Sequence, residues 1–377
     1  MRKRTTIPLL IVLIVLALLG TMLYLRAKAP PEAARLLPES DAILFVQFDA
    51  IRSATHFDQT PVARSPDFQH FIDATGIVPE RDLDSVAFAF HRMPDPNGPN
   101  GPVAYSEVFV GHFDGVRLDH YLASIATAQE AYTGRTIYTI PIQGRQLRVT
   151  QLGYDIIAAS NMPTAEQIHS MLDRSRASAL STPGSSLLAA RFHQVPLLAE
   201  AWGIGHIGLP FSDNGFISVL GLQLPLPEDT DLVASLRYNA AAHLLSGGTV
   251  HLRIEEIAPT PSAAERTVDT LSTILGILRG LSMEQASTQQ APTPAADAMR
   301  SVLNSITLTQ RENRALLNAT ASLDELKALA SAHNPTSVSA VPEATAPAPV
   351  SASPAAPPAS NQQLSRQHPT QKRNQGR

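Results

Sequence analysis

The feature that most constrains this chain is an apolar run near its start, residues 7–25, which reads IPLLIVLIVLALLGTMLYL. It carries no charged side chain over 19 residues. An α-helix rises about 1.5 Å per residue, so a run of this length crosses a hydrocarbon core of roughly 30 Å. Residues 1–6 hold three basic side chains, against two just after the run, which favours a cytoplasmic N-terminus. We therefore expect a single-pass protein of the cytoplasmic (inner) membrane, with its main domain extracytoplasmic.

A cleaved signal peptide is the competing interpretation. Ala27-Lys28-Ala29 offers the small-x-small pattern of a cleavage site. However, Pro30 would follow the cut directly, where a processing enzyme tolerates it poorly, and the apolar run exceeds the ~7 to 15 residues of a typical signal core. These two features favour an uncleaved signal anchor. The folded part is exported under either interpretation.

The chain contains no cysteine. This excludes a disulfide framework, a cysteine-ligated zinc or iron–sulfur site, a cysteine nucleophile and a lipid-acylated cysteine. The net charge of −4 is the opposite of the basic character that nucleic-acid binding requires. Nucleic acid is therefore not an expected partner, whereas the lipid bilayer is, through residues 7–25.

Downstream of the apolar run, the sequence divides by composition. Residues 26–40 form a spacer containing Ala, Pro and Glu, and residues 332–377 are rich in Ala, Pro and Ser with no aromatic side chain, which predicts a disordered tail. Between them, alternating runs typical of strands are interleaved with amphipathic helical stripes. This predicts an α+β fold with mostly antiparallel sheet, in two similarly built halves at 41–180 and 181–331. The polar stretch 284–298 is predicted to be a flexible insertion.

A short polar residue recurs where a helix is expected to begin. The stretch FVQFDAIR at 45–52 has a near twin, FVGHFDGVR at 109–117, and in both an aspartate follows a strand-like run. Asp, Asn and Ser side chains accept hydrogen bonds from the free N–H groups of a helix's first turn. By this rule, and by the Ser-x-x-Glu capping-box pattern, six structural helix caps are predicted: Asp49, Ser65, Asp114, Asn239 (before a helix over 240–245), Ser262 and Ser322.

Two pairs of polar residues are candidates for reactive sites. His112 and Asp114 have the spacing that points them to one side of a strand, as an acid–base pair or a metal site requires. The twin stretch has Gln47 before its Phe-Asp and no histidine, so capping explains both copies and catalysis explains one. Glu255 and Glu256 are adjacent on an expected strand and would face opposite sides, so they cannot act together as a glycosidase pair.

Motifs for cofactors and metals are weak or missing. GIGHIG at 203–208 matches the G-x-G-x-x-G dinucleotide pattern, but a loop-like stretch follows it instead of a helix N-terminus, so a strand is the simpler interpretation. Twelve histidines are present without His-x-His or His-Glu-x-x-His spacing. No nucleophile elbow and no phosphate-binding loop occur. The sequence therefore predicts no cofactor, no metal and no catalytic residue, while a triad assembled from distant residues stays open.

The stretches LPESDAILFVQFDAIR and FVGHFDGVRLDHYL, with the basic N-terminus, the anchor and the Pro/Ala tail, resemble uncharacterised membrane-anchored envelope proteins of bacteria. The resemblance covers residues 37 to about 331 and implies no active site that could be transferred. We expect a non-catalytic binding or scaffolding module that contacts another envelope protein or the cell wall. The alternatives are an envelope hydrolase acting on cell-wall or carbohydrate material, and a carrier of lipid or hydrophobic cargo.

Overall fold

The computed structural model describes residues 16–17, 20–21, 29–59, 64–98, 101–142, 144–177, 184–206, 216–219, 222–225, 230–239, 248–288 and 293–333. Three predictions fall wholly or mostly outside these ranges. They are the anchor over 7–25, the helix over 240–245 and the tail over 332–377, of which only the first two residues are described.

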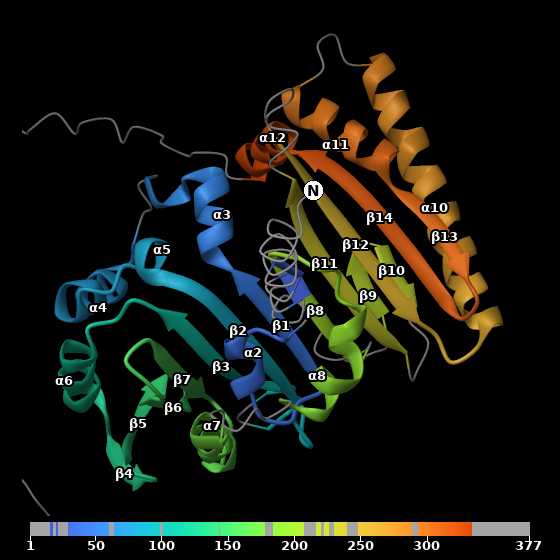
Figure 1. Ribbon diagram of the computed structural model, residues 1–377. Helices are drawn as coiled ribbons and strands as arrows, with labels where there is room; N and C mark the ends of the chain where they lie inside the picture. The colour runs from blue at the N-terminus through green and yellow to red at the C-terminus, as the bar shows by residue number, and fades with distance from the viewer. Residues whose placement is uncertain are drawn as a thin grey trace, which may run out of the picture. The chain divides into compact units, whose positions relative to one another are not determined.

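Antiparallel pairing organises the described part of the chain into a twelve-stranded sheet (Figure 1). Its strands are β1 (Ala42–Gln47), β2 (Leu83–Arg92), β3 (Val103–Gly111), β4 (Ala128–Tyr132), β5 (Arg135–Ile142), β6 (Arg145–Gln151), β7 (Ile156–Ser160), β8 (Ala201–His206), β11 (Asp231–Asn239), β12 (Thr249–Ile257), β13 (Thr307–Arg311) and β14 (Arg314–Ser322). Their spatial order is β13-β14-β12-β11-β8-β1-β2-β3-β7-β6-β5-β4. A separate hairpin pairs β9 (Phe216–Val219) with β10 (Leu222–Pro225). The predicted α+β class with mostly antiparallel sheet is therefore confirmed.

Helices connect these strands and pack on the sheet. They are α2 (Glu32–Leu36), α3 (Phe48–Thr55), α4 (Pro66–Thr75), α5 (Pro79–Asp82), α6 (Gly115–Ile125), α7 (Glu166–Ala177), α8 (Ser186–Arg191), α10 (Pro261–Thr288), α11 (Pro294–Ser305) and α12 (Leu323–His333). Figure 1 shows α10 lying along β13 and β14, with which it is in contact.

The two predicted halves share this one sheet. Strands β1 to β7 form an unbroken block on one side, and β8 and β11 to β14 form the block on the other. The blocks meet where β1 pairs antiparallel with β8, for example at Phe45 and Trp202. The boundary predicted at residue 180 thus separates two blocks of strands within a single unit.

The strands alternate their side chains between two faces of the sheet. One face, which we call the α2 face, packs beneath α2, α7 and α8, and its core includes Ile43, Phe45, Val108, Trp202 and Ile204. The opposite face, which we call the α6 face, packs beneath α6 over β5, β6 and β7, and beneath α10 over β14. Most of the buried core therefore lies on the α2 face, beneath helices from the first half of the chain and from α8.

The flexible insertion predicted at 284–298 is wrong where the structure describes it. Helix α10 continues to Thr288, and α11 already begins at Pro294. Thr293 Oγ1 accepts a hydrogen bond from Ala296 N at 3.2 Å, and proline fits the first helical position because it needs no N–H partner there. The polar composition and the prolines of this stretch are typical of a loop, but Pro294 occupies the first position of a helix.

Candidate functional site

Three of the predicted caps lie at helix starts and make the expected hydrogen bonds. Ser65 Oγ accepts from Phe68 N at 3.3 Å at the start of α4. Asp114 Oδ1 accepts from the first free N–H groups of α6, both at 3.1 Å. Ser322 and Glu325 form a reciprocal capping box before α12, with distances of 3.2 and 2.7 Å. These side chains are therefore structural.

Two predicted caps are wrong. Helix α3 begins two residues earlier than predicted, so Gln47 occupies the cap position and Asp49 lies inside the first turn, where its Oδ1 accepts from the next N–H at 2.7 Å. Ser262 also lies inside a first turn, because Pro261 opens α10 and Thr260 Oγ1 accepts from Ala263 N at 3.2 Å. Asn239 is the last residue of β11, and the helix it was predicted to cap lies outside the described residues.

The FVGHFDGVR stretch does not form a reactive pair. His112 is 82% exposed, and its Nδ1 lies 3.3 Å from Asp84 Oδ2. The Asp114 side chain instead accepts hydrogen bonds from backbone N–H groups at the start of α6. Among the described residues, no group of three His, Asp or Glu side chains is arranged to hold a metal ion.

The other sequence candidates also have structural contacts. Gly203 and Gly205 of GIGHIG lie in β8, hydrogen-bonded between β1 and β11, as predicted for a strand. Glu255 forms ion pairs with Arg253 and Arg314, whereas Glu256 Oε1 accepts from Thr267 of α10, so the two glutamates face opposite sides.

A histidine–serine chain is buried on the α2 face. His91 Nε2 lies 3.0 Å from Ser106 Oγ, which lies 3.0 Å from Ser160 Oγ. Burial lowers the pKa of His91, against a smaller opposing effect of Asp41. The arrangement resembles a nucleophile beside its base, but Ser106 has no exposed surface. A substrate therefore cannot reach this hydroxyl, and the chain serves to satisfy buried polar groups.

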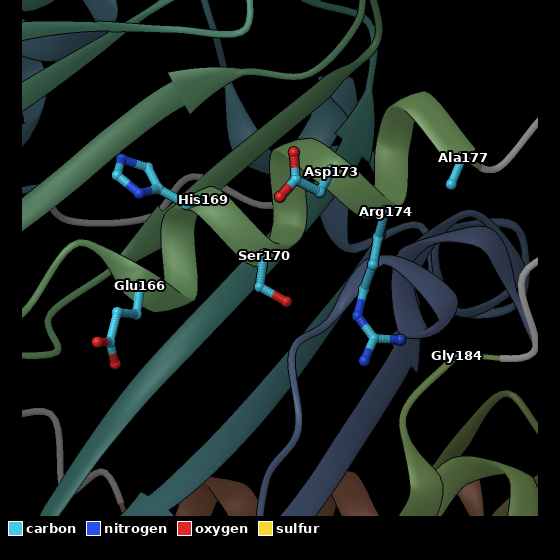
Figure 2. Close-up of a pocket in the computed structure, with 7 residues that line it drawn as sticks. All are labelled: Glu166, His169, Ser170, Asp173, Arg174, Ala177 and Gly184. Carbon is cyan, nitrogen blue, oxygen red and sulfur yellow. The ribbon is translucent and has the colours of Figure 1, made fainter.

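A surface hollow of about 640 Å³ lies beside α7. Seven residues line it, and we call it the α7 hollow: Glu166, His169, Ser170, Asp173, Arg174, Ala177 and Gly184. Figure 2 shows His169 and Asp173 pointing to one side of α7, while Ser170 and Arg174 point to the other. The serine and the histidine are therefore not placed as nucleophile and base.

The histidine side of the α7 hollow is held in place by β4. The rings of His169 and Tyr132 stack with centroids 3.9 Å apart and planes 8° from parallel. His169 Nε2 lies 2.9 Å from Glu130 Oε1, and the Tyr132 hydroxyl donates to Asp173 at 3.1 Å. The bond to Asp173 raises the pKa of Tyr132, because it stabilises the protonated phenol. These contacts fix both rings against the helix.

The arginine side is held by the spacer before β1. Arg174 donates to Glu39 at 2.8 Å, and the other oxygen of Glu39 accepts from the N–H and the hydroxyl of Ser186 at 2.8 and 2.6 Å. Burial alone would raise the pKa of Glu39, but these hydrogen bonds outweigh burial and lower it. The Arg174 charge is thus already paired within the protein.

The remaining charge of the α7 hollow is negative. Two lining residues are carboxylates, Glu166 and Asp173, and Glu166 makes no hydrogen bond or ion pair within the described ranges. Among the described residues that line it, the one guanidinium is that of Arg174, which is paired with Glu39. Sequence reasoning missed this cluster, because its members lie on β4, on α7 and in the spacer, with no local motif joining them.

Comparisons with known proteins do not assign a family. No protein-family model and no curated protein matches the chain. Solved structures that resemble it include crystal forms III and I of TP0453, with TM-scores of 0.43 and 0.40 and 11% sequence identity in each case. The alignments cover 80% and 81% of this chain, and 99% and 98% of the other. Within the described part of the chain, no helix has both the length and the apolarity needed to cross a membrane.

Proposed function

We propose that this chain is a membrane-anchored protein whose folded part lies outside the cytoplasm and binds another envelope component without catalysing a reaction. The uncharged run over 7–25 supports the anchor, and the three basic residues before it support the orientation. The large sheet with helices on both faces supports a binding module, because it offers broad, rigid surfaces.

The observation that carries the binding role is the α7 hollow. It is open to solvent and large enough for several side chains of a partner, and its unpaired charge is negative. Its potentially reactive groups point apart or are bound to each other, so recognition fits this geometry better than catalysis. A partner with lysine or arginine side chains complements Glu166 and Asp173.

Crosslinking in cells, followed by affinity capture of the full-length chain and mass spectrometry, tests this proposal. The wild type is expected to capture a stoichiometric envelope protein, and Glu166→Lys combined with Asp173→Lys is expected to lose it. Asp324→Lys, on the 82% exposed side chain of Asp324 in α12, is the matched control. Equal capture by the double variant would refute a role for the α7 hollow.

A further inference from the structure

An isolated carboxyl group lies in the middle of the sheet. Glu107 is on β3 and points to the α6 face, opposite Phe88 of β2 and Ala159 of β7. Within the described part of the chain it makes no hydrogen bond and no ion pair, and burial raises its pKa to about 7. A carboxylate removed from water without a partner is costly, and such positions are enriched at functional sites. No role in holding the fold together accounts for this glutamate.

Aromatic residues neighbour Glu107 on its own strand and on β2. Phe109 lies two residues away on the same face of β3. The Phe88 ring lies 6.5 Å from the Phe109 ring, edge to face, and 6.4 Å from the Phe90 ring, nearly parallel. The faces of aromatic rings carry negative potential and attract cations. Carboxylate and rings together therefore favour a positively charged group.

An apolar strip of residues continues from Phe88 across the same face of the sheet. Along one row of paired residues, Phe88 is followed by Leu44, Gly203 and Ala234. The Leu44 side chain is 38% exposed, and a Cβ added at Gly203 would meet only ordinary contacts. The helices with close contacts to β1 and β8, namely α2 and α8, lie on the opposite face. Within the described residues, neither of these helices covers the strip.

We propose that Glu107, Phe88, Phe90, Phe109, Leu44 and Gly203 form a binding site for a small organic cation with an apolar body. Its ammonium group binds between the Glu107 carboxylate and the phenylalanine rings, and its apolar part lies along Leu44 and Gly203. Charge complementarity selects this occupant, because the strip supplies one carboxyl group beside aromatic rings, and the residues paired with Glu107, Phe88 and Ala159, bring no cationic side chain. The site is separate from the α7 hollow and does not depend on its role.

Equilibrium dialysis of the full chain in phosphatidylglycerol nanodiscs tests this proposal, with binding to empty nanodiscs subtracted. The probes are benzyltrimethylammonium and neopentylbenzene, which has the same shape and carbon in place of the charged nitrogen. We expect the cation to bind the wild type at least about tenfold more tightly than the neutral probe, consistent with a desolvated charge contact.

Variants distinguish the contribution of the Glu107 carboxylate to binding from that of the surrounding apolar surface. Glu107→Gln keeps the shape of the side chain but removes its negative charge, and is expected to lower the affinity for the cation at least about tenfold. Phe88→Leu removes one aromatic ring and is expected to lower this affinity severalfold. Asp324→Asn, at an exposed position of α12, a helix that packs on α11 and β14, is expected to bind like the wild type. Melting curves confirm that each variant is folded. Equal affinity of the wild type and folded Glu107→Gln for the cation, or equal binding of both probes, would overturn the proposal.

Discussion

Replacing Glu107 by glutamine is expected to change how stability depends on pH. Burial raises the pKa of this carboxyl from 4.5 to about 7 in the folded chain. Below about pH 4.5 the group is protonated in both states and has no effect on stability. As the pH rises toward 7, the unfolded state loses its proton first, so folding becomes less favourable. The wild type therefore loses stability over this window, and Glu107→Gln does not.

The size of this effect follows from the difference between the two pKa values. One pKa unit corresponds to about 1.4 kcal/mol, so a change from 4.5 to about 7 corresponds to at most about 3.5 kcal/mol. Water reaches part of the side chain, so we expect a measured value between about 1 and 3 kcal/mol. Any cost of burying the amide is the same at every pH and cancels from the comparison.

Urea unfolding of the full chain near pH 5 and near pH 8 measures this difference. The single tryptophan, Trp202, is buried against Phe45 and Phe192 and provides the fluorescence signal. The stability of Glu107→Gln relative to the wild type is expected to increase between the two pH values, while that of Asp324→Asn stays constant. If the relative stability of Glu107→Gln did not change with pH, the carboxyl would have to be solvated or paired in the folded chain.

Other substitutions test the packing and the helix starts. Asp114→Ala is expected to lower the free energy of unfolding by about 1 kcal/mol, because two N–H groups lose their acceptor. Asp49→Ala is expected to lower it by clearly less, because the Asp49 side chain does not occupy the cap position. Equal losses in urea unfolding would contradict the two assignments. Met171→Ala removes a fully buried side chain on the core-facing side of α7 and is expected to cost about 2 to 5 kcal/mol, measured as a lower Tm; a smaller loss would mean a loosely packed core there. Burial would raise the pKa of Glu255, but its two arginine partners outweigh burial and lower it. The ion pairs therefore stabilise the fold above about pH 4.5, and this stabilisation is lost as the pH falls further. Glu255→Gln should therefore be less stable than the wild type at neutral pH and equal to it in acid, as urea unfolding at both pH values can check.

Features that depend on neighbouring residues were predictable from the sequence. The Ser322-x-x-Glu325 box forms because both partners lie within one helical turn, and the alternation along β3 places Ala104 and Val108 in the core. The cap of α10 was missed although its signal is local. Thr260 precedes Pro261, the first residue of α10, and Thr293 precedes Pro294, the first residue of α11, so in both a threonine followed by proline marks the start.

Features that depend on strand register could not be predicted. The α7 hollow joins Glu39, β4 and α7, and nothing in the sequence near His169 indicates Tyr132 as its neighbour. The position of Glu107 was visible as a charge between two aromatic residues of an alternating strand, but its lack of a partner depends on which residues β2 and β7 place opposite it. Pairing between distant strands decides this, and a single sequence does not reveal that pairing.

The junction between β1 and β8 has a consequence for how the chain is made. Strand β1 is synthesised early and can pair at once with β2, which follows it after a few short helices. Its other edge stays open until His206 has been made, since β8 is the strand that closes it. Open strand edges recruit other strands, so this interval exposes the chain to mispairing with its neighbours. Correct folding therefore depends on how long that edge of β1 stays unpaired, and slow synthesis of residues 48 to 200 should favour aggregation.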